Sequence, residues 1–168
     1  MKISIYGTGW LGKPLAEHLT LHNFNVIAPQ WRAITNQSID YWKPLIEADV
    51  QVWSIPPRTK QNGPEFYENI LSEWTKFLQN FPVKKIVFCS STSVYEASEK
   101  IIDENTIVNL DSVISKAEKI IIDSGIPYLI IRLGGLMGGD RFVAKYYSGK
   151  TVDRANSPVN YLHQYDAV

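Results

Sequence analysis

The opening stretch of the chain, KISIYGTGWLGKPLAEHL at residues 2–19, constrains the fold more than any other segment. A short apolar run leads directly into Gly7, Gly9 and Gly12, and then into a segment with the apolar spacing of a helix. Glycines at this spacing permit a tight turn, admit a pyrophosphate close to the backbone, and let the helix pack against the strand. The free N–H groups at the start of the helix then face the anion.

The predicted phosphate site comprises the whole turn from Gly7 to Gly12. Thr8 lies within it, and Trp10 and Leu11 contribute backbone N–H groups whatever their side chains do. A tight strand-to-helix turn without a ligand is the alternative, because glycine spacing alone is a weak signal. The context favours a dinucleotide site, since a strand precedes the glycines and an amphipathic helix follows them.

Strand-like and helix-like segments alternate along most of the chain. Apolar runs bounded by turn residues occur at 2–6, 25–28, 50–55, 85–90 and 128–133. Between them, apolar residues at helical spacing form one stripe from Phe66 to Phe81 and another from Val113 to Ile121. This alternation predicts a Rossmann-type α/β fold, a doubly wound parallel sheet with helices on both faces.

The length of 168 residues fits one domain, which we expect to span residues 1–168. The expected strand order is 3-2-1-4-5. The third strand is expected to be short or missing, because residues 29–48 have room for one helix, SIDYWKPLIEA, and a stub of strand at RAIT. After Met137 the pattern fades, and we expect residues 140–168 to be the start of a truncated substrate lobe.

Charge and apolar composition exclude several classes of partner. Lys+Arg and Asp+Glu both count 17, so no net field gathers nucleic acid or an anionic membrane surface. No apolar run approaches the roughly 20 residues of a membrane-spanning helix, and no signal segment precedes the first strand. The single cysteine, Cys89, lies in an apolar run and is typical of a buried thiol. We expect a cytoplasmic protein.

The end of the second strand bears on the choice between NAD and NADP. An acidic side chain there would bind the ribose hydroxyls and repel a 2′-phosphate. The sequence VIAPQWRAIT has no acid, and Gln30 and Arg32 stand where a ribose phosphate would lie. This pattern favours NADP(H) over NAD(H), with an exposed Arg32 that binds no ligand as the alternative.

Several motifs occur in an order found in one known family. They are the glycine turn, FCSSTSVYE, SKAEKII, IIRLGGLMGGDR and VNYLHQYDAV, which together cover nearly the whole chain. In this the chain resembles the extended and atypical short-chain dehydrogenases/reductases, of the NAD-dependent epimerase/dehydratase type that acts on nucleotide-linked sugars. WSIPPR and the glycine spacing look most like the branch described as nucleoside-diphosphate-sugar epimerases.

The resemblance implies roles for three residues. Ser91 matches the family residue that hydrogen-bonds the substrate oxygen, with simple turn formation by SSTS as the alternative. Lys116 matches the lysine of the family's Tyr-x-x-x-Lys, which lowers the pKa of the tyrosine and holds the nicotinamide ribose. Ser112 stands where the tyrosine is expected, and a serine hydroxyl is a poor general acid near neutral pH.

Other positions have weaker signals. The resemblance implies that the loop of Pro56 and Arg58 covers the cofactor, although prolines also shape ordinary turns. Gly134 and Gly135 permit close approach to the nicotinamide end. Tyr95 is a candidate to replace the lost phenol, with packing against its own loop as the alternative.

Three histidines receive structural interpretations. His18 and His22 are spaced i,i+4, but no third residue has suitable spacing for a metal, so we expect a pair of surface histidines. His163 and Asp166 match the family's H-x-x-D, which links the two lobes.

Three hypotheses follow. The first is an enzyme that uses NADP(H) to oxidise, reduce or epimerise a sugar nucleotide or a similar hydroxylated small molecule. The second is a module that binds NADP(H) without catalysis, as a structural ligand or redox sensor. The third is a scaffold without a nucleotide. A homodimer is compatible with each.

Overall fold

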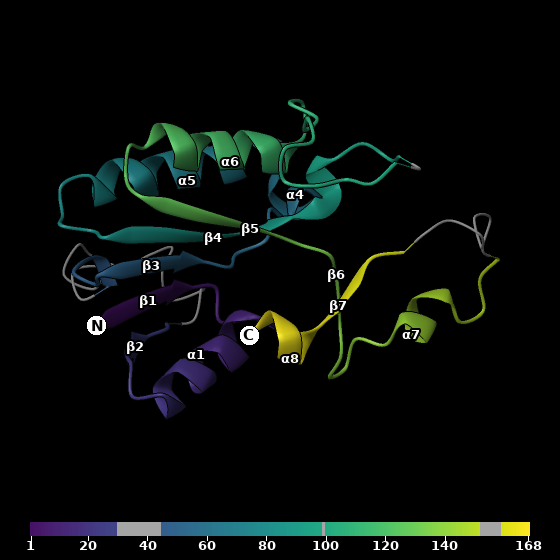
Figure 1. Cartoon of the computed structure of the whole chain (residues 1–168), viewed down its shortest axis with the longest axis horizontal. Coiled ribbons are helices and arrows are strands. Elements are labelled where there is room, and N and C mark those ends of the chain that lie inside the picture. Colours follow the sequence, from purple (N-terminus) through teal and green to yellow (C-terminus); the bar gives the residue numbers. More distant parts are fainter. Residues whose placement is uncertain (30–44, 99, 152–158) are drawn as a thin grey trace.

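The computed structural model describes residues 1–29, 45–98, 100–151 and 159–168. Its centre is a parallel sheet of five strands in the order β2-β1-β3-β4-β5 (Figure 1). The strands are β1 (Lys2–Tyr6), β2 (Asn25–Ile27), β3 (Val50–Trp53), β4 (Lys85–Ser91) and β5 (Tyr128–Leu133). This sheet confirms the predicted fold class.

The strand order agrees with the expected one when the third strand is left out. β1 pairs with β2 at Ile3 and Val26, and with β3 at Ile5 and Val52. The short β2 is therefore an edge strand of the described sheet. The predicted strand stub RAIT and most of the predicted helix SIDYWKPLIEA fall outside the described residues.

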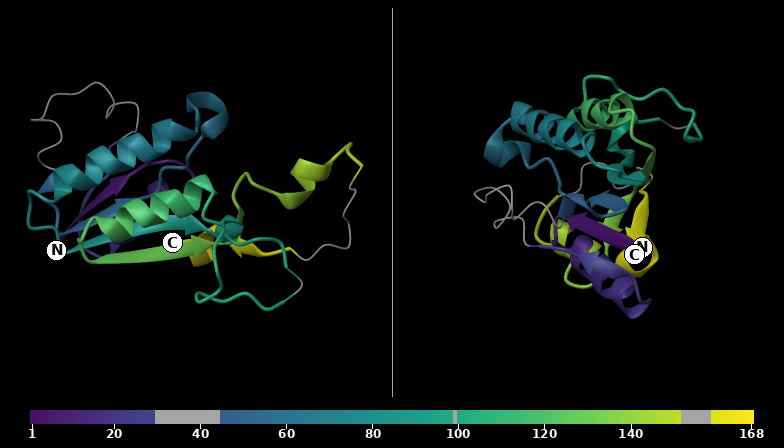
Figure 2. Two further views of the ribbon diagram at one scale, coloured as in Figure 1. Left: turned by 90° about the horizontal axis from the view of Figure 1, so that it is seen from above. Right: turned by 90° about the vertical axis from the view of Figure 1, so that its left-hand side faces the viewer.

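Helices cover both faces of the sheet. Figures 1 and 2 show α5 (Pro64–Leu78) and α6 (Val113–Asp123) together over one face and α1 (Gly12–Leu21) on the other. The hydroxyl of Ser112 caps α6 by accepting from the backbone N–H of Ser115 at 3.0 Å. After α6, Gly125 adopts the left-handed conformation with φ of 72°, so it allows the chain to leave the helix and enter β5.

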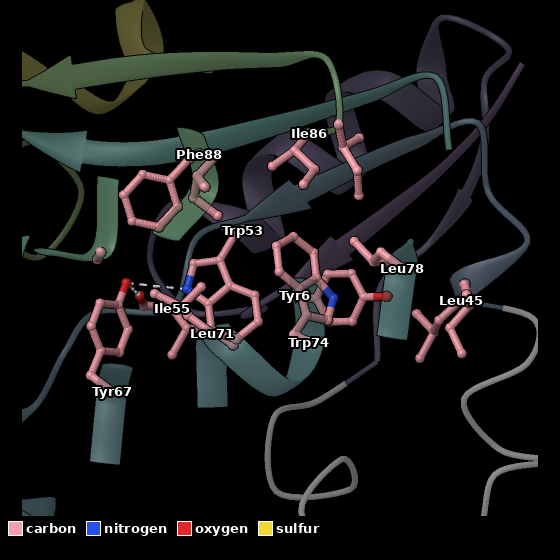
Figure 3. Packing of buried hydrophobic residues seen from close by; sticks show 14 residues of the cluster. Tyr6, Leu45, Trp53, Ile55, Tyr67, Leu71, Trp74, Leu78, Ile86 and Phe88 are labelled. Atoms are coloured by element: carbon pink, nitrogen blue, oxygen red, sulfur yellow. Dashed lines mark hydrogen bonds between the residues drawn. The ribbon is translucent and has the colours of Figure 1, made fainter. Parts of the chain in front are cut away.

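The larger core lies between the sheet and α5, and is rich in aromatic rings (Figure 3). Tyr6 of β1 stacks on Trp53 of β3 with ring centroids 5.8 Å apart. Trp74 of α5 meets Tyr6 edge-on at 5.1 Å. Trp53 donates through Nε1 to the Tyr67 hydroxyl at 3.1 Å, and that hydroxyl donates to the Ile55 carbonyl at 2.8 Å. The polar tips of Trp53 and Tyr67 are thus hydrogen-bonded, whereas the buried indole nitrogen of Trp74 has no hydrogen-bond partner among the described residues.

One residue of the apolar stripe predicted for α5 does not lie on the buried face of the helix. Phe66 is 39% exposed, whereas its neighbour Tyr67 is 2% exposed. The buried face follows Tyr67, Leu71, Trp74 and Leu78, which share the i, i+4, i+7 spacing of one helix side. Tyr67 displaces Phe66 because its hydroxyl completes the hydrogen bonds at the end of β3.

After β5 the chain leaves the sheet and forms an extension that we call the C-terminal arm, residues 135–151 and 159–168. It contains β6 (Gly135–Met137), α7 (Val143–Tyr147), β7 (Tyr161–His163) and α8 (Gln164–Ala167), with β6 and β7 paired in parallel. Figure 1 shows that α7 lies farthest from the sheet, whereas α8 returns to the start of α1. The arm therefore reaches the carboxyl edge of the sheet.

In the part of the chain that the structure describes, no helix is both long and apolar enough to cross a bilayer.

We expect Leu71→Ala to lower the free energy of unfolding by about 2–5 kcal/mol, because Leu71 is fully buried and its loss leaves a cavity between α5 and the sheet. Leu21→Ala is the control, since Leu21 is 80% exposed and should change the same quantity by at most about 0.5 kcal/mol. Urea unfolding followed by circular dichroism measures both. Equal losses in the two variants would contradict the described core.

Candidate functional site

A cleft opens at the carboxyl ends of the central strands. It is bounded by the glycine turn after β1, the loop after β3, and the ends of β4 and β5. In this sheet the chain runs outward from β1 to β2 and then returns to β3 on the other side of β1. That reversal is the switch point at which parallel α/β sheets bind ligands. The described residues that line the cleft are Trp10, Leu11, Ser54, Ile55, Pro56, Pro57, Arg58, Tyr67, Cys89, Ser90, Ser91, Ile114, Leu133, Gly134, Leu136 and Arg141.

The three glycines of the turn differ in what surrounds them. Gly7 has a φ of 98°, which L-residues with a side chain rarely adopt. A Cβ on Gly12 would overlap the carbonyl oxygen of Gly7, so helix and strand are as close as glycine permits. A Cβ on Gly9 would meet no atom within 4 Å. Gly9 therefore faces open space, and its lack of a side chain is not required by packing.

The start of α1 is free of a side-chain cap. Leu11 is the N-cap residue, and no side chain accepts a hydrogen bond from the first N–H groups. The first turn of a helix leaves up to four N–H groups without an intrahelical partner. In α1, Pro14 has no N–H and the Lys13 N–H donates to the Gly9 carbonyl at 3.1 Å. The N–H groups of Leu11 and Gly12 therefore remain. With the positive end of the helix dipole, these groups fit an anion at the open position beside Gly9.

Two side chains, one from the turn and one from the end of β3, hold the turn in place. Ser54, directly after β3, donates through Oγ to the Gly7 carbonyl at 2.6 Å and approaches the Tyr6 carbonyl at 3.1 Å. Thr8 donates through Oγ1 to the Pro29 carbonyl at 3.3 Å, which joins the turn to the end of β2. Sequence reasoning placed Thr8 in the turn but missed Ser54, whose only signal is its position at a strand end.

Trp10 connects the turn to the C-terminal arm. Its indole Nε1 donates to Asp140 Oδ1 at 3.1 Å, and the Arg141 guanidinium lies over its ring at 4.6 Å from the centroid. Gln164 of α8 donates through Nε2 to the Trp10 carbonyl at 2.6 Å. The side chain of Trp10 is thus engaged by the arm, while its backbone remains part of the turn.

Ser91 lies at the end of β4 and lines the cleft. Its hydroxyl accepts from the backbone N–H of Ser93 at 3.1 Å and so caps the short 3-10 helix η1 (Thr92–Val94). The turn interpretation of SSTS is therefore confirmed, and the role of Ser91 toward a substrate oxygen stays a prediction. Cys89 also lines the cleft, and burial raises the pKa of its thiol to about 11.

The structure does not bring Ser112 and Lys116 into the cleft together with Ser91. Ser112 lines a groove that adjoins the cleft at Pro57, Arg58 and Ile114, and its hydroxyl caps α6. Lys116 is not among the described residues that line the cleft or the groove. Its ammonium lies 3.9 Å from Glu68 of α5.

A polar network behind the cleft was not anticipated. Glu118 of α6 is only 3% exposed, accepts two hydrogen bonds from Arg132 at 3.0 and 2.8 Å, and accepts a third from Ser90. Arg132 also donates to the Tyr95 hydroxyl at 2.6 Å. These bonds, first of all the one to Glu118, raise the pKa of the guanidinium. The network fastens α6 and the loop after β4 to β5.

That network settles the surroundings of Tyr95. The centroid of the Tyr95 ring lies 5.1 Å from the guanidinium carbon of Arg132. Tyr95 lines a separate depression together with Ile102, Asp103 and Glu104. Tyr95 is not among the described residues of the central cleft. The phenol is engaged by Arg132 outside the cleft, which agrees with the packing interpretation of Tyr95.

The remaining predicted cofactor residues are partly located. Pro56 and Arg58 line the cleft from the loop after β3, where Arg58 has a left-handed φ of 47°. Gly134 also lines the cleft, but a Cβ there would lie 2.9 Å from the amide oxygen of Asn160, so the close approach that it permits is to the arm. Arg32 lies outside the described residues.

The histidines are engaged structurally. The rings of His18 and His22 lie side by side with centroids 4.3 Å apart, and the described residues contain no group of three or more side chains arranged to hold a metal. His163 packs so closely on Gly138 that a Cβ there would lie 2.5 Å from its Nε2. Its Nδ1 accepts from the backbone N–H of Tyr165 at 3.2 Å.

Comparison with known proteins places this geometry in context. No family model matches the chain. Over 192 aligned positions the chain is 28% identical to Protein YeeZ of Escherichia coli strain K12, with coverage of 99% of this chain and 70% of that protein. The alignment with YeeZ thus extends along nearly the whole of this chain.

Solved structures agree on the fold. UDP-N-acetylglucosamine 4-epimerase from Bacillus cereus superposes with a TM-score of 0.76 at 18% identity, covering 99% of this chain and 70% of that one. MoeE5 in complex with UDP-glucose and NAD superposes with a TM-score of 0.72 at 17% identity, covering 98% and 68%. The chain therefore has the fold of the UDP-sugar epimerases and related short-chain dehydrogenases/reductases, as the sequence motifs predicted.

We expect the Cys89 thiol to react slowly in the folded protein. A thiol with a pKa of about 11 is ionised to only ~10⁻³ at pH 8, whereas an ordinary thiol is ionised to about a quarter. Alkylation by iodoacetamide at pH 8 should therefore be slower than in urea by about 10–100-fold, and should accelerate as the pH rises toward 11. Since Cys89 is the only cysteine, mass spectrometry reads it directly. Equal rates in the folded and unfolded chain would contradict its burial.

Proposed function

We propose that this chain binds an NAD(P) dinucleotide at the glycine turn, and acts as an epimerase-like or oxidoreductase-like protein on a sugar nucleotide or a related hydroxylated molecule. The observation that carries the proposal is the uncapped start of α1 beside the open position at Gly9, located at the switch point of the sheet. Solved structures with this fold include a complex with UDP-glucose and NAD, which supports the same ligand classes here.

The proposed cofactor preference is NADP(H) over NAD(H). β2 ends at Ile27 and is followed by Ala28 and Pro29, so no carboxylate follows the strand where it would repel a 2′-phosphate. The carbonyl of Pro29 accepts the hydroxyl of Thr8, which keeps the end of β2 beside the turn. In the proposal, Arg32 meets the 2′-phosphate. The domain proposed for this role spans residues 1–168, with residues 140–168 beginning the substrate lobe.

The chemistry proposed for this chain depends on few side chains. A bound nicotinamide would supply hydride transfer. Ser91, a half-buried hydroxyl in the cleft, would orient the substrate oxygen. Lys116 would have to leave Glu68 to reach the nicotinamide ribose. Ser112 cannot replace a phenol as general acid, so the proton transfer that normally accompanies hydride transfer is the weak step.

A second candidate function is a dinucleotide-binding module without efficient catalysis. Two contacts favour it. The Ser112 hydroxyl is committed to capping α6 through Ser115, and the Lys116 ammonium is paired with Glu68 outside the cleft. A chain that binds the cofactor but lacks the groups for proton transfer would hold NADP(H) as a structural ligand or as a redox sensor.

We expect Gly9→Asp to abolish dinucleotide binding without loss of stability. The new side chain meets no protein atom within 4 Å at its Cβ, but it introduces size and negative charge beside the start of α1. Gly9→Asn is the control that adds the same volume without the charge, and should bind more tightly than Gly9→Asp. Titration calorimetry with NADP⁺ and NAD⁺, together with thermal unfolding, measures both quantities. Unchanged affinity in Gly9→Asp would show that the glycine turn is structural only.

We expect slow or absent turnover of sugar nucleotides by the wild-type chain, and a gain from Ser112→Tyr. Positioned acid–base catalysis contributes about 10²–10⁴-fold, which sets the upper limit of that gain. Adding Glu68→Gln should increase it further, because this change frees Lys116. With a panel of sugar nucleotides, nicotinamide absorbance at 340 nm measures net oxidation or reduction, and chromatography of the sugar nucleotide measures epimerisation, which leaves the cofactor unchanged overall. Robust wild-type turnover that is indifferent to Ser112→Ala and Lys116→Ala would refute these roles.

A further inference from the structure

We propose that Arg141 of the C-terminal arm binds the pyrophosphate of the dinucleotide, opposite the backbone N–H groups of the glycine turn. This inference rests on the proposed dinucleotide site and adds to it a side-chain ligand that the glycine motif does not contain.

The position of Arg141 follows from Trp10. Trp10 belongs to the phosphate turn, and its indole is fixed by the hydrogen bond to Asp140. The Arg141 guanidinium lies over that indole at 4.6 Å from the ring centroid, and Arg141 lines the same cleft as Leu11 and Ser54. The guanidinium is thus held beside the glycine turn, in a cleft that the loop of Arg58 also lines.

The N–H groups of the Arg141 guanidinium are available to a ligand. Among the described residues, no carboxylate pairs with Arg141 and no side-chain hydrogen bond engages it. Arg132, by contrast, is fully committed to Glu118 and Tyr95. A half-buried arginine without an anionic partner, beside a helix start without a cap, is an arrangement that a diphosphate would complete.

Stacking on Trp10 suits this role. An arginine stacks through the face of its planar guanidinium, which leaves the N–H groups at its edge directed outward. These groups form a fork that matches the oxygens of a phosphate. Asp140 is the opposing charge nearby, and its carboxylate is engaged by the indole. Removal of that charge should therefore favour an anion at the site.

The test compares Arg141→Gln with Lys145→Gln, which removes the same charge from an exposed position on the same arm. Titration calorimetry with NADP⁺, NAD⁺ and ADP-ribose should show a loss of ~10–100-fold for Arg141→Gln, as expected for a charge-assisted hydrogen bond, and little change for Lys145→Gln. Arg141→Lys should recover part of the affinity. Adenosine, followed by ligand-observed NMR, should bind both variants like the wild type because it has no phosphate.

Two further results separate the possible failures. If Arg141 only supports Trp10, Arg141→Gln will lose affinity for adenosine as well, and the inference is wrong. Asp140→Asn keeps an oxygen for the indole and should bind NADP⁺ more tightly, so weaker binding would also overturn it. Wild-type affinity in Arg141→Gln overturns the inference but leaves the dinucleotide site standing. A wild-type chain that binds no dinucleotide overturns both.

Discussion

The close approach of Gly12 to the Gly7 carbonyl is the constraint on which the rest of the site depends. No side chain fits between these residues. The hydroxyl of Ser54, at the end of β3, donates a hydrogen bond to the same Gly7 carbonyl. These two contacts at the Gly7 carbonyl therefore fix the distances from β1 to α1 and from β1 to β3. Because the helix start and two strand ends are placed together, the N–H groups of α1 face the cleft at the switch point, where the dinucleotide is proposed to lie.

Different interactions hold the two sides of the cleft in place. Beside the glycine turn, the arm reaches Trp10 through Asp140 and Gln164, contacts that cross 130 and 154 positions of sequence. On the other side, the buried Glu118 and Arg132 fasten α6 and the loop after β4 to β5. A buried pair of this kind is costly to break, since removal of one partner leaves an uncompensated charge. Lys116, by contrast, pairs with Glu68 and is not among the described residues that line the cleft.

Local sequence patterns were sufficient to predict the parallel sheet, its order and the glycine turn, because each depends on neighbouring residues and on the rule that parallel strands share one carboxyl edge. They were insufficient where a contact depends on tertiary position. Ser54 and Arg141 carry no motif, and the face of α5 shifted from Phe66 to Tyr67 because a hydroxyl was needed at the end of β3. Gly134 also makes room for Asn160, a contact that no local pattern indicates, while its approach to a cofactor stays a prediction.

The central claim is that the glycine turn is the nucleotide site. Its most direct test is a titration of the ¹⁵N-labelled chain with NADP⁺, followed by amide and indole NMR resonances. The account predicts that the largest shifts fall on residues 7–13 and on the Trp10 indole, with the ends of β3 and β4 next. Shifts confined to the groove lined by Lys60 and Ser93, or the absence of any shift at the turn, would contradict it.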